Sequence, residues 1–176
     1  GTTSLDSGNG NVRVGALAAS GAINASANAI RIEGGSGMNF AALTTDVGDA
    51  YVRSTGNLTV GNANVAGAAD LRTQGATMTI GGLTAANATL ENTGGSLTLG
   101  SVTVAGNLAA TARTSLGVNG VVTGQSISLA SGAIDISPAG RVGTAGVTQT
   151  LSVANNNSAN QTFIGGTGSP GWAAAR

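Results

Sequence analysis

The residues best suited to acid–base chemistry are a few carboxylates in one stretch of the chain. Asp46 and Asp49 lie three positions apart, close to Tyr51, and Glu33 opens the same segment, EGGSGMNFAALTTDVGDA, at residues 33–50. Enzymes that cleave polysaccharides commonly use paired carboxylates as acid and base. Carboxylates also cap turns and keep loops soluble. We prefer that second interpretation for Asp46 and Asp49, and we expect no enzymatic activity.

The residue types present in the sequence give little support for a metal site or a phosphate site. The sequence contains no His, no Cys and no Lys, which removes the usual metal ligands and the lysine of a phosphate-binding loop. The segment GGSGMNF, residues 34–40, matches half of a calcium-binding nonapeptide. It occurs once, however, and Asn39 stands where that repeat needs Asp. We interpret it as a glycine-rich loop and expect no metal, no cofactor and no catalytic residue.

Three threonines recur at a nearly constant spacing. They are Thr59, Thr79 and Thr98, and each stands between two apolar residues. If these triplets stack, the threonines form an exposed ladder, and a second column beside it holds Asn57, Thr77 and Ser96. Such a ladder would suit a carbohydrate or an ice surface. The alternative is ordinary threonine in exposed strands, where its β-branched side chain is favoured.

A column of charges follows the same spacing. Arg53, Arg72 and Glu91 are separated by two equal steps, each as long as the step between Thr79 and Thr98. If they stack, Arg53 repels Arg72, whereas Arg72 attracts Glu91. We interpret the column as a solvated face that contributes at most ~1 kcal/mol to stability, and the alternative is a ligand site.

An internal repeat must position all of these residues. Apolar-x-apolar triplets recur at a nearly even spacing, with one longer step between Ile30 and Leu58. We therefore expect one coil to carry an insertion at about residues 33–50. The triplets are Val12-Arg13-Val14, Ile30-Arg31-Ile32, Leu58-Thr59-Val60, Met78-Thr79-Ile80, Leu97-Thr98-Leu99, Leu116-Gly117-Val118 and Ile134-Asp135-Ile136.

Each repeat predicts three short strands, because apolar and polar residues alternate within each piece. After a glycine corner, a second strand is expected at 64–66, 83–85 and 102–104. The third is centred on Val52, Leu71, Leu90, Leu108 and Ile127. A unit this small cannot bury its apolar side alone. The sequence thus predicts an all-β single-stranded parallel β-helix, or β-solenoid, of about eight coils at residues 1–164, followed by a Gly- and Pro-containing tail at 165–176.

The composition narrows the function further. Charged residues are 8 % of the chain and the formal net charge is zero, so a nucleic-acid partner is not expected. No apolar run is long enough to span a bilayer, and none reads as a signal peptide. The hydrophobic share of 41 % and the periodicity argue against disorder. Because Gly1 stands where a Met would be expected, we expect a processed product or an excised piece.

The repeats GNLTVGNANVAGAADLRTQ and GGSLTLGSVTVAGNLAATAR, residues 56–74 and 94–113, resemble those of filamentous-haemagglutinin-like exoproteins, which are large bacterial surface adhesins secreted through an outer-membrane partner. The likeness covers about residues 9–153 and rests on the repeat length and the G-x-L-x-[VIL]-G pattern. It implies a right-handed β-helix and an extracellular location at the bacterial cell surface. The Asn-Pro motifs of that family's secretion domain do not occur here, which implies a piece of the shaft.

The predicted solenoid shows no sequence cap at either end, and two explanations are open. The chain is a segment of a longer rod, or it is a subunit joined end to end with copies of itself, with Phe163, Ile164 and Trp172 contacting the next copy. Trp172 would otherwise plug the open end or stack on a sugar. Expected partners are adjacent repeats, further copies and a host-cell or surface glycan receptor. The predicted function is a structural or adhesive rod, and the alternative is a ligand-binding module with an exposed Thr/Asn/Ser face.

Overall fold

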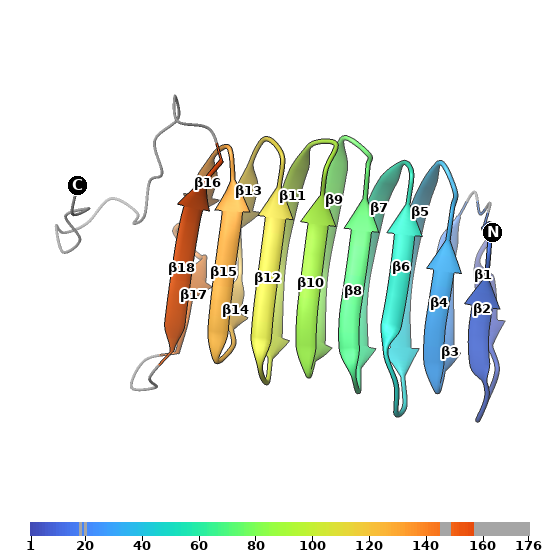
Figure 1. Cartoon of the computed structure of the whole chain (residues 1–176). Helices are drawn as coiled ribbons and strands as arrows, with labels where there is room; N and C mark the ends of the chain where they lie inside the picture. The colour runs from blue at the N-terminus through green and yellow to red at the C-terminus, as the bar shows by residue number, and fades with distance from the viewer. Residues whose placement is uncertain (18, 20, 145–148, 157–176) are drawn as a thin grey trace, which may run out of the picture.

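The fold was analysed in a computed structural model, which describes residues 1–17, 19, 21–144 and 149–156. Within these residues every regular element is a β-strand, and neighbouring strands within each sheet are parallel (Figure 1). The predicted contact residues Phe163, Ile164 and Trp172, and the predicted tail at 165–176, lie outside the described residues. The all-β parallel solenoid predicted from the repeats is confirmed.

The strands form two sheets. Sheet A has the order β1-β3-β5-β7-β9-β11-β13-β16, with β14 and β17 beside it, and sheet B has the order β2-β4-β6-β8-β10-β12-β15-β18. The bounds in sheet A are β1 Thr3–Asp6, β3 Ala22–Ala27, β5 Gly37–Thr45, β7 Asn57–Val65, β9 Thr77–Ala85, β11 Ser96–Val104, β13 Leu116–Val118, β14 Val121–Thr123, β16 Ile134–Ile136 and β17 Arg141–Val142. Those in sheet B are β2 Asn11–Val14, β4 Ala29–Glu33, β6 Ala50–Ser54, β8 Ala68–Thr73, β10 Asn87–Asn92, β12 Asn107–Ala112, β15 Ser126–Ser131 and β18 Thr150–Asn155.

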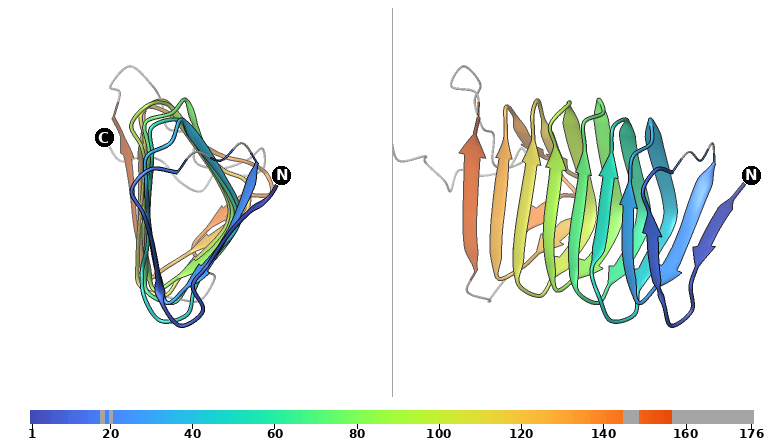
Figure 2. Two further views of the ribbon diagram at one scale, coloured as in Figure 1. Left: turned by 90° about the vertical axis from the view of Figure 1, so that its right-hand side faces the viewer. Right: turned by 45° about the vertical axis from the view of Figure 1, so that its right-hand side comes forward.

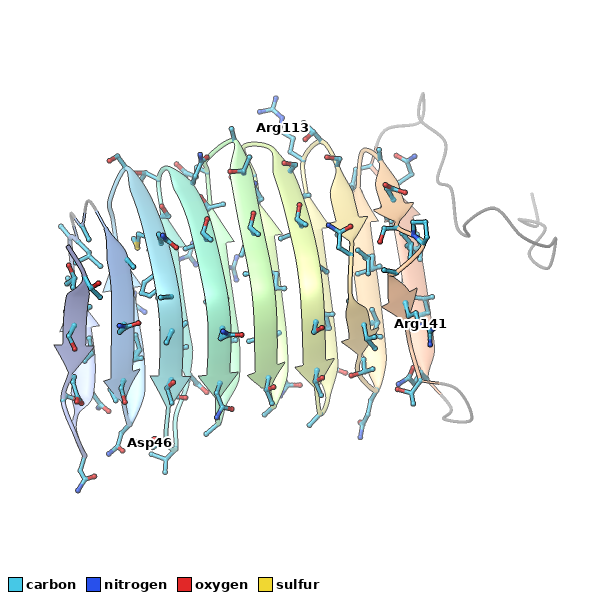
Figure 3. The ribbon with its side chains drawn as sticks, turned by 180° about the vertical axis from the view of Figure 1, so that it is seen from behind. Asp46, Arg113 and Arg141 are labelled. Carbon is cyan, nitrogen blue, oxygen red and sulfur yellow. The ribbon has the colours of Figure 1, made fainter. Side chains whose placement is uncertain are left out.

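Each coil contributes one strand to sheet B and one long or two short strands to sheet A. The coils follow one another about a common axis and enclose a roughly triangular section (Figure 2). The strands of sheet B run upward in Figure 1, and those of sheet A run downward behind them as the chain advances, which makes the solenoid right-handed (Figures 1 and 3). The eight strands of sheet B correspond to about seven turns, close to the predicted eight coils.

The register of the first predicted column is confirmed. Leu58 pairs with Met78, Met78 with Leu97, and Leu97 with Leu116, and Leu116 then pairs with Ile134. Because equivalent inward residues meet in every turn, each short strand buries its apolar side against its neighbours in the adjoining turns. A coil that could not be stable alone is thereby stabilised by stacking.

The predicted insertion at residues 33–50 is wrong. The segment Met38-Asn39-Phe40 pairs with Leu58-Thr59-Val60 and is therefore the missing triplet of that column. The triplets that begin at Val12 and Ile30 lie instead in sheet B. The long step from Ile30 to Leu58 was therefore measured between residues of two different columns. The longest step is in the last turn, where Ser126 pairs with Thr150. A smaller irregularity lies beside Phe40, where the register between β3 and β5 shifts by one residue.

Two other predicted alignments need correction. Leu90 pairs with Ala110, whereas Leu108 pairs with Ala88 and Ile127. The predicted second strand at 64–66 is one residue too late, because Thr84 pairs with Asn64 and Leu83 with Ala63. The first error spans two residues and so keeps the same face inward, which is why apolar alternation did not reveal it.

The core is a column of aliphatic side chains along the axis. Residues of the central turns, such as Leu58, Leu97 and Leu129, have no exposed surface, whereas Leu5 and Val12 in the first turn are only partly buried. The interior also holds an aromatic ring, since Phe40 is fully buried in it. The core therefore reaches the first turn, and no described residue fully covers its apolar side chains there.

Candidate functional site: the charged face of sheet B

Seven of the thirteen charged side chains among the described residues lie on the outward side of sheet B. We call the outward surface of β2, β4, β6, β8 and β10 the charged face. It carries four of the seven arginines of the sequence and three of the seven carboxylates. They are Arg13, Arg31, Glu33, Arg53, Asp70, Arg72 and Glu91, with Tyr51 among them. The sequence interpretation placed Arg13 and Arg31 in the threonine column; the register puts them here instead.

Arg72 is the centre of a closed ion network. Its Nε and Nη2 donate to the two carboxylate oxygens of Asp70, at 2.6 and 3.2 Å, and its Nη1 donates to Glu91 at 2.6 Å. The hydrogen bond with Asp70 is the main reason that the pKa of Arg72 rises above its ordinary value. The predicted attraction between Arg72 and Glu91 is confirmed. The contribution of Asp70 was missed, because it lies two positions away on the same strand and not one repeat away.

The Tyr51 ring is close to two guanidinium groups. The guanidinium carbon of Arg31 is 4.1 Å from the centre of the Tyr51 ring, and that of Arg53 is 4.9 Å away. Arg53 also donates a hydrogen bond to the Tyr51 hydroxyl, and Arg31 forms an ion pair with Glu33. These contacts hold the Tyr51 ring against two cations.

Two arginines of the charged face have no carboxylate partner among the described residues. Arg53 lies opposite Arg72 in the register, as predicted, and Arg13 lies opposite Arg31. The carboxylates of the face are bonded to the other two arginines, since Arg31 pairs with Glu33 and Arg72 binds both Asp70 and Glu91. Like charges opposite each other in a sheet are unfavourable, so Arg13 and Arg53 are cations whose charge is open to an external anion.

A shallow groove of about 570 Å³ runs over this face from β2 to β10. Two small outward residues, Ala29 on β4 and Ala68 on β8, leave the surface hollow, and polar side chains stand along it. We call it the alanine groove. Its lining includes Ala29 and Ala68, which are partly exposed, and Ala50, Ala69 and Ala88, whose side chains belong to the buried core. The polar residues that line it are Asn11, Arg13, Arg31, Asp49, Tyr51, Asp70, Asn87 and Thr89.

The three carboxylates considered for catalysis are not all brought together, because Glu33 lies apart from Asp46 and Asp49. Asp49 Oδ1 accepts a hydrogen bond from the Ala68 backbone N–H at 2.7 Å, so it joins one turn to the next. Asp46 lies in the same corner and is exposed (Figure 3). Glu33 lies at the other end of β4, about 13 Å of strand away from that corner, and pairs with Arg31. The described residues contain no group of three or more side chains that could hold a metal ion.

The threonine ladder lies in register. Thr59 pairs with Thr79 and Thr79 with Thr98. Thr59 and Thr79 are exposed as predicted, whereas Thr98 is half-buried. The neighbouring column is joined by a side chain as well, because Asn57 Oδ1 accepts a hydrogen bond from the Thr77 backbone N–H at 3.0 Å.

A longer polar column was missed by the sequence interpretation. It lies on the second half of the long strands of sheet A, where successive residues pair from turn to turn. Six of its seven members carry a hydroxyl or an amide, and the alternation within each strand was the available signal. In chain order they are Asp6, Ser26, Thr44, Asn64, Thr84, Thr103 and Thr123.

Comparison with known proteins adds no relative to this description. No protein-family model matches the chain, and neither a similar curated protein nor a similar solved structure was found. The described part of the chain contains no helix that is long and apolar enough to cross a membrane.

Proposed function

We propose that this chain is a structural or adhesive segment of a β-helical rod in an extracellular bacterial surface protein. The observation that carries the proposal is the stacking of turns through paired strands, from Thr3 to Asn155. A stack of this kind has a fixed diameter and lengthens by one rung, ~4.8 Å, for each added turn. It is therefore suited to hold a distance and to display side chains along a line.

Both forms of the proposal, a shaft segment and a protomer joined end to end, use the open first turn. Among the strands that the structure describes, β1 and β2 each have a hydrogen-bonded neighbour on one side only. Leu5, Val12 and Val14 point toward the core there and are partly exposed. A further coil, from a longer chain or from a second copy, would pair with these edges and cover these side chains.

Electron microscopy and size-exclusion chromatography of the pure chain test this proposal. We expect elongated particles that associate end to end as concentration rises. Val14→Lys would place a charge in the open core end and reduce the association. Ser4→Lys, on the outward side of the same turn, is the matched control and should associate normally. A compact monomer with no concentration dependence, in both the parent and the variants, would contradict the proposal.

The proposed location is tested separately. Antibodies raised against the solenoid should label intact cells of the source bacterium, or filaments released from them. Labelling that requires cells to be broken open would contradict an extracellular role and leave the rod itself unaffected.

The alternative, a ligand-binding solenoid, is favoured by one observation: the threonine ladder and the longer polar column both present hydrogen-bonding groups at each rung. Ice binding predicts thermal hysteresis in the parent chain and its loss in Thr79→Lys, with Arg113→Lys as control. Equal freezing behaviour of the parent and Thr79→Lys would rule this version out.

A further inference from the structure

We propose that the alanine groove binds a linear polysaccharide that carries carboxylate groups. The inference supplies a ligand for the adhesive form of the proposed function and relies on that function for its biological setting. The binding itself depends only on the groove and on the residues that line it.

The shape of the groove favours an extended chain. The lining residues come from five neighbouring strands, β2, β4, β6, β8 and β10. Five strands span four rung spacings, so the groove is ~19 Å long. A volume of about 570 Å³ spread over that length is narrow and shallow. A linear polymer laid along the rod axis fills such a groove better than a compact small molecule does.

The backbone of the groove excludes the usual way of holding an extended peptide. Peptides added to a sheet gain their affinity from hydrogen bonds to an unpaired strand edge. Here β4, β6, β8 and β10 are each paired on both sides, and the open edge of β2 faces away from β4 and from the rest of the groove. The groove therefore offers a ligand side chains and not strand edges.

The lining chemistry matches a sugar chain. The methyl groups of Ala29 and Ala68 give an apolar surface for the C–H faces of pyranose rings. Asn11, Asn87 and Thr89 stand beside that floor and carry amides and a hydroxyl that hydrogen-bond with sugar hydroxyls. A mostly apolar floor with a few placed polar groups is the usual composition of a ligand site.

Arg13 gives the groove its preference for a carboxylate. It lines the groove, is exposed, and forms no ion pair or side-chain hydrogen bond with any described residue. A guanidinium binds a carboxylate through two parallel hydrogen bonds. Arg31 is one rung away but is already paired with Glu33. Arg13 is thus the cation of the groove that is free to meet an incoming carboxylate.

The same residues disfavour a densely charged polymer. Asp49 and Asp70 also line the groove, and the whole sequence contains no Lys. A nucleic acid carries one phosphate on every nucleotide and needs a surplus of cations. A polysaccharide with one carboxylate per sugar or per pair of sugars can place a carboxylate at Arg13 and hydroxyls at Asp49 and Asp70.

The test is isothermal titration calorimetry of the full chain with oligomers of galacturonate, guluronate and hyaluronan. The fully methyl-esterified galacturonate oligomer serves as the neutral control, and poly-glutamate as the acidic peptide control. Arg13→Gln removes the free cation, and Arg113→Gln removes a cation at a corner away from the groove (Figure 3). Ala68→Gln fills the groove without adding charge, and Ala130→Gln places the same side chain farther along sheet B. Circular dichroism establishes that each variant is folded.

We expect at least one carboxylated oligomer to bind, with an affinity that falls as salt rises. Arg13→Gln and Ala68→Gln should each weaken binding by about five- to tenfold, whereas both control variants bind like the parent. The proposal is overturned if none of the three oligomers binds, if the methyl ester or poly-glutamate binds as tightly, or if folded Ala68→Gln retains full affinity. None of these outcomes alters the particle shape or end-to-end association by which the rod itself is judged.

Discussion

Arg53 and Arg72 lie directly opposite each other in the register of β6 and β8, yet only Arg72 is bonded to carboxylates. The network around Arg72 neutralises one of the two cations and leaves Arg53 to interact with the ring and hydroxyl of Tyr51. The charged face is therefore a set of local pairs with two cations left over, and not a uniform strip of alternating charge.

Removal of Glu91 tests the stabilising role of this network. We expect Glu91→Gln to lower the free energy of unfolding by about 0.5–1 kcal/mol, because the pair with Arg72 is partly exposed and Asp70 keeps the cation neutralised. Urea titrations at low and high salt measure this loss of stability, which should be smaller at high salt. Asp46→Asn, at an exposed corner, should change stability by less than about 0.5 kcal/mol. A larger loss for Asp46→Asn would contradict the assignment.

The stacked core predicts a strong contrast between neighbouring residues. Leu97 is fully buried between Met78 and Leu116. We expect Leu97→Ala to lower the free energy of unfolding by about 2–5 kcal/mol, because it leaves a cavity that two turns share. Thr98→Ala, the next position and on the outward side, should cost less than about 1 kcal/mol. Equal losses in chemical denaturation would show that the two residues do not lie on opposite faces.

The glycine corners make a separate prediction. A Cβ on Gly75 would lie 2.3 Å from the carbonyl carbon of Gly56, so Gly75→Ala forces two turns apart. We expect a loss of about 1–3 kcal/mol in the free energy of unfolding. A Cβ added to Gly117 would have no atom within 4 Å apart from its chain neighbours. We therefore expect Gly117→Ala to stabilise the strand by about 0.5–1 kcal/mol. Thermal unfolding followed by circular dichroism compares them, and destabilisation by Gly117→Ala would count against the described packing.

A buried amide holds another corner in place. Asn92 is 1 % exposed. Its Oδ1 accepts hydrogen bonds from the backbone N–H groups of Gly94 and Gly95, at 2.9 and 3.0 Å, and its Nδ2 donates to Ser96 O at 2.6 Å. We expect Asn92→Ala to cost about 2–4 kcal/mol, because three backbone groups lose their partner in a buried place. Asn107→Ala, at an exposed asparagine, should cost less than about 1 kcal/mol. Urea denaturation that finds both variants equally stable would contradict this role.

The sequence was sufficient for the fold class because apolar triplets recur at a nearly even spacing and apolar residues alternate within each strand. It was insufficient for the register wherever two inward columns look alike. Val12 and Ile30 were joined to the column of Leu58, although Met38 is the residue that pairs with Leu58. Both columns consist of apolar-x-apolar triplets, so the pattern does not indicate to which sheet a triplet belongs.

The candidate site was harder to predict for the same reason. The attraction of Arg72 for Glu91 followed from the repeat spacing, and the register confirms it. The position of Arg31 beside Tyr51 did not follow, because it depends on a pairing between β4 and β6 that the supposed insertion had hidden. The lining of the alanine groove comes from five strands, and no single segment of sequence marks it.

The most direct test of the account is cysteine cross-linking along the threonine ladder, since the native chain has no cysteine of its own. Paired strands place Thr59 and Thr79 one rung apart, ~4.8 Å, which is within the range of a disulfide, whereas Thr59 and Thr98 are two rungs apart. We predict that Thr59→Cys with Thr79→Cys closes a disulfide rapidly under mild oxidation in the folded chain, and that Thr59→Cys with Thr98→Cys does not. Rapid closure of the second pair, or none of the first, would contradict the stacked parallel register on which the rod, the charged face and the groove all depend.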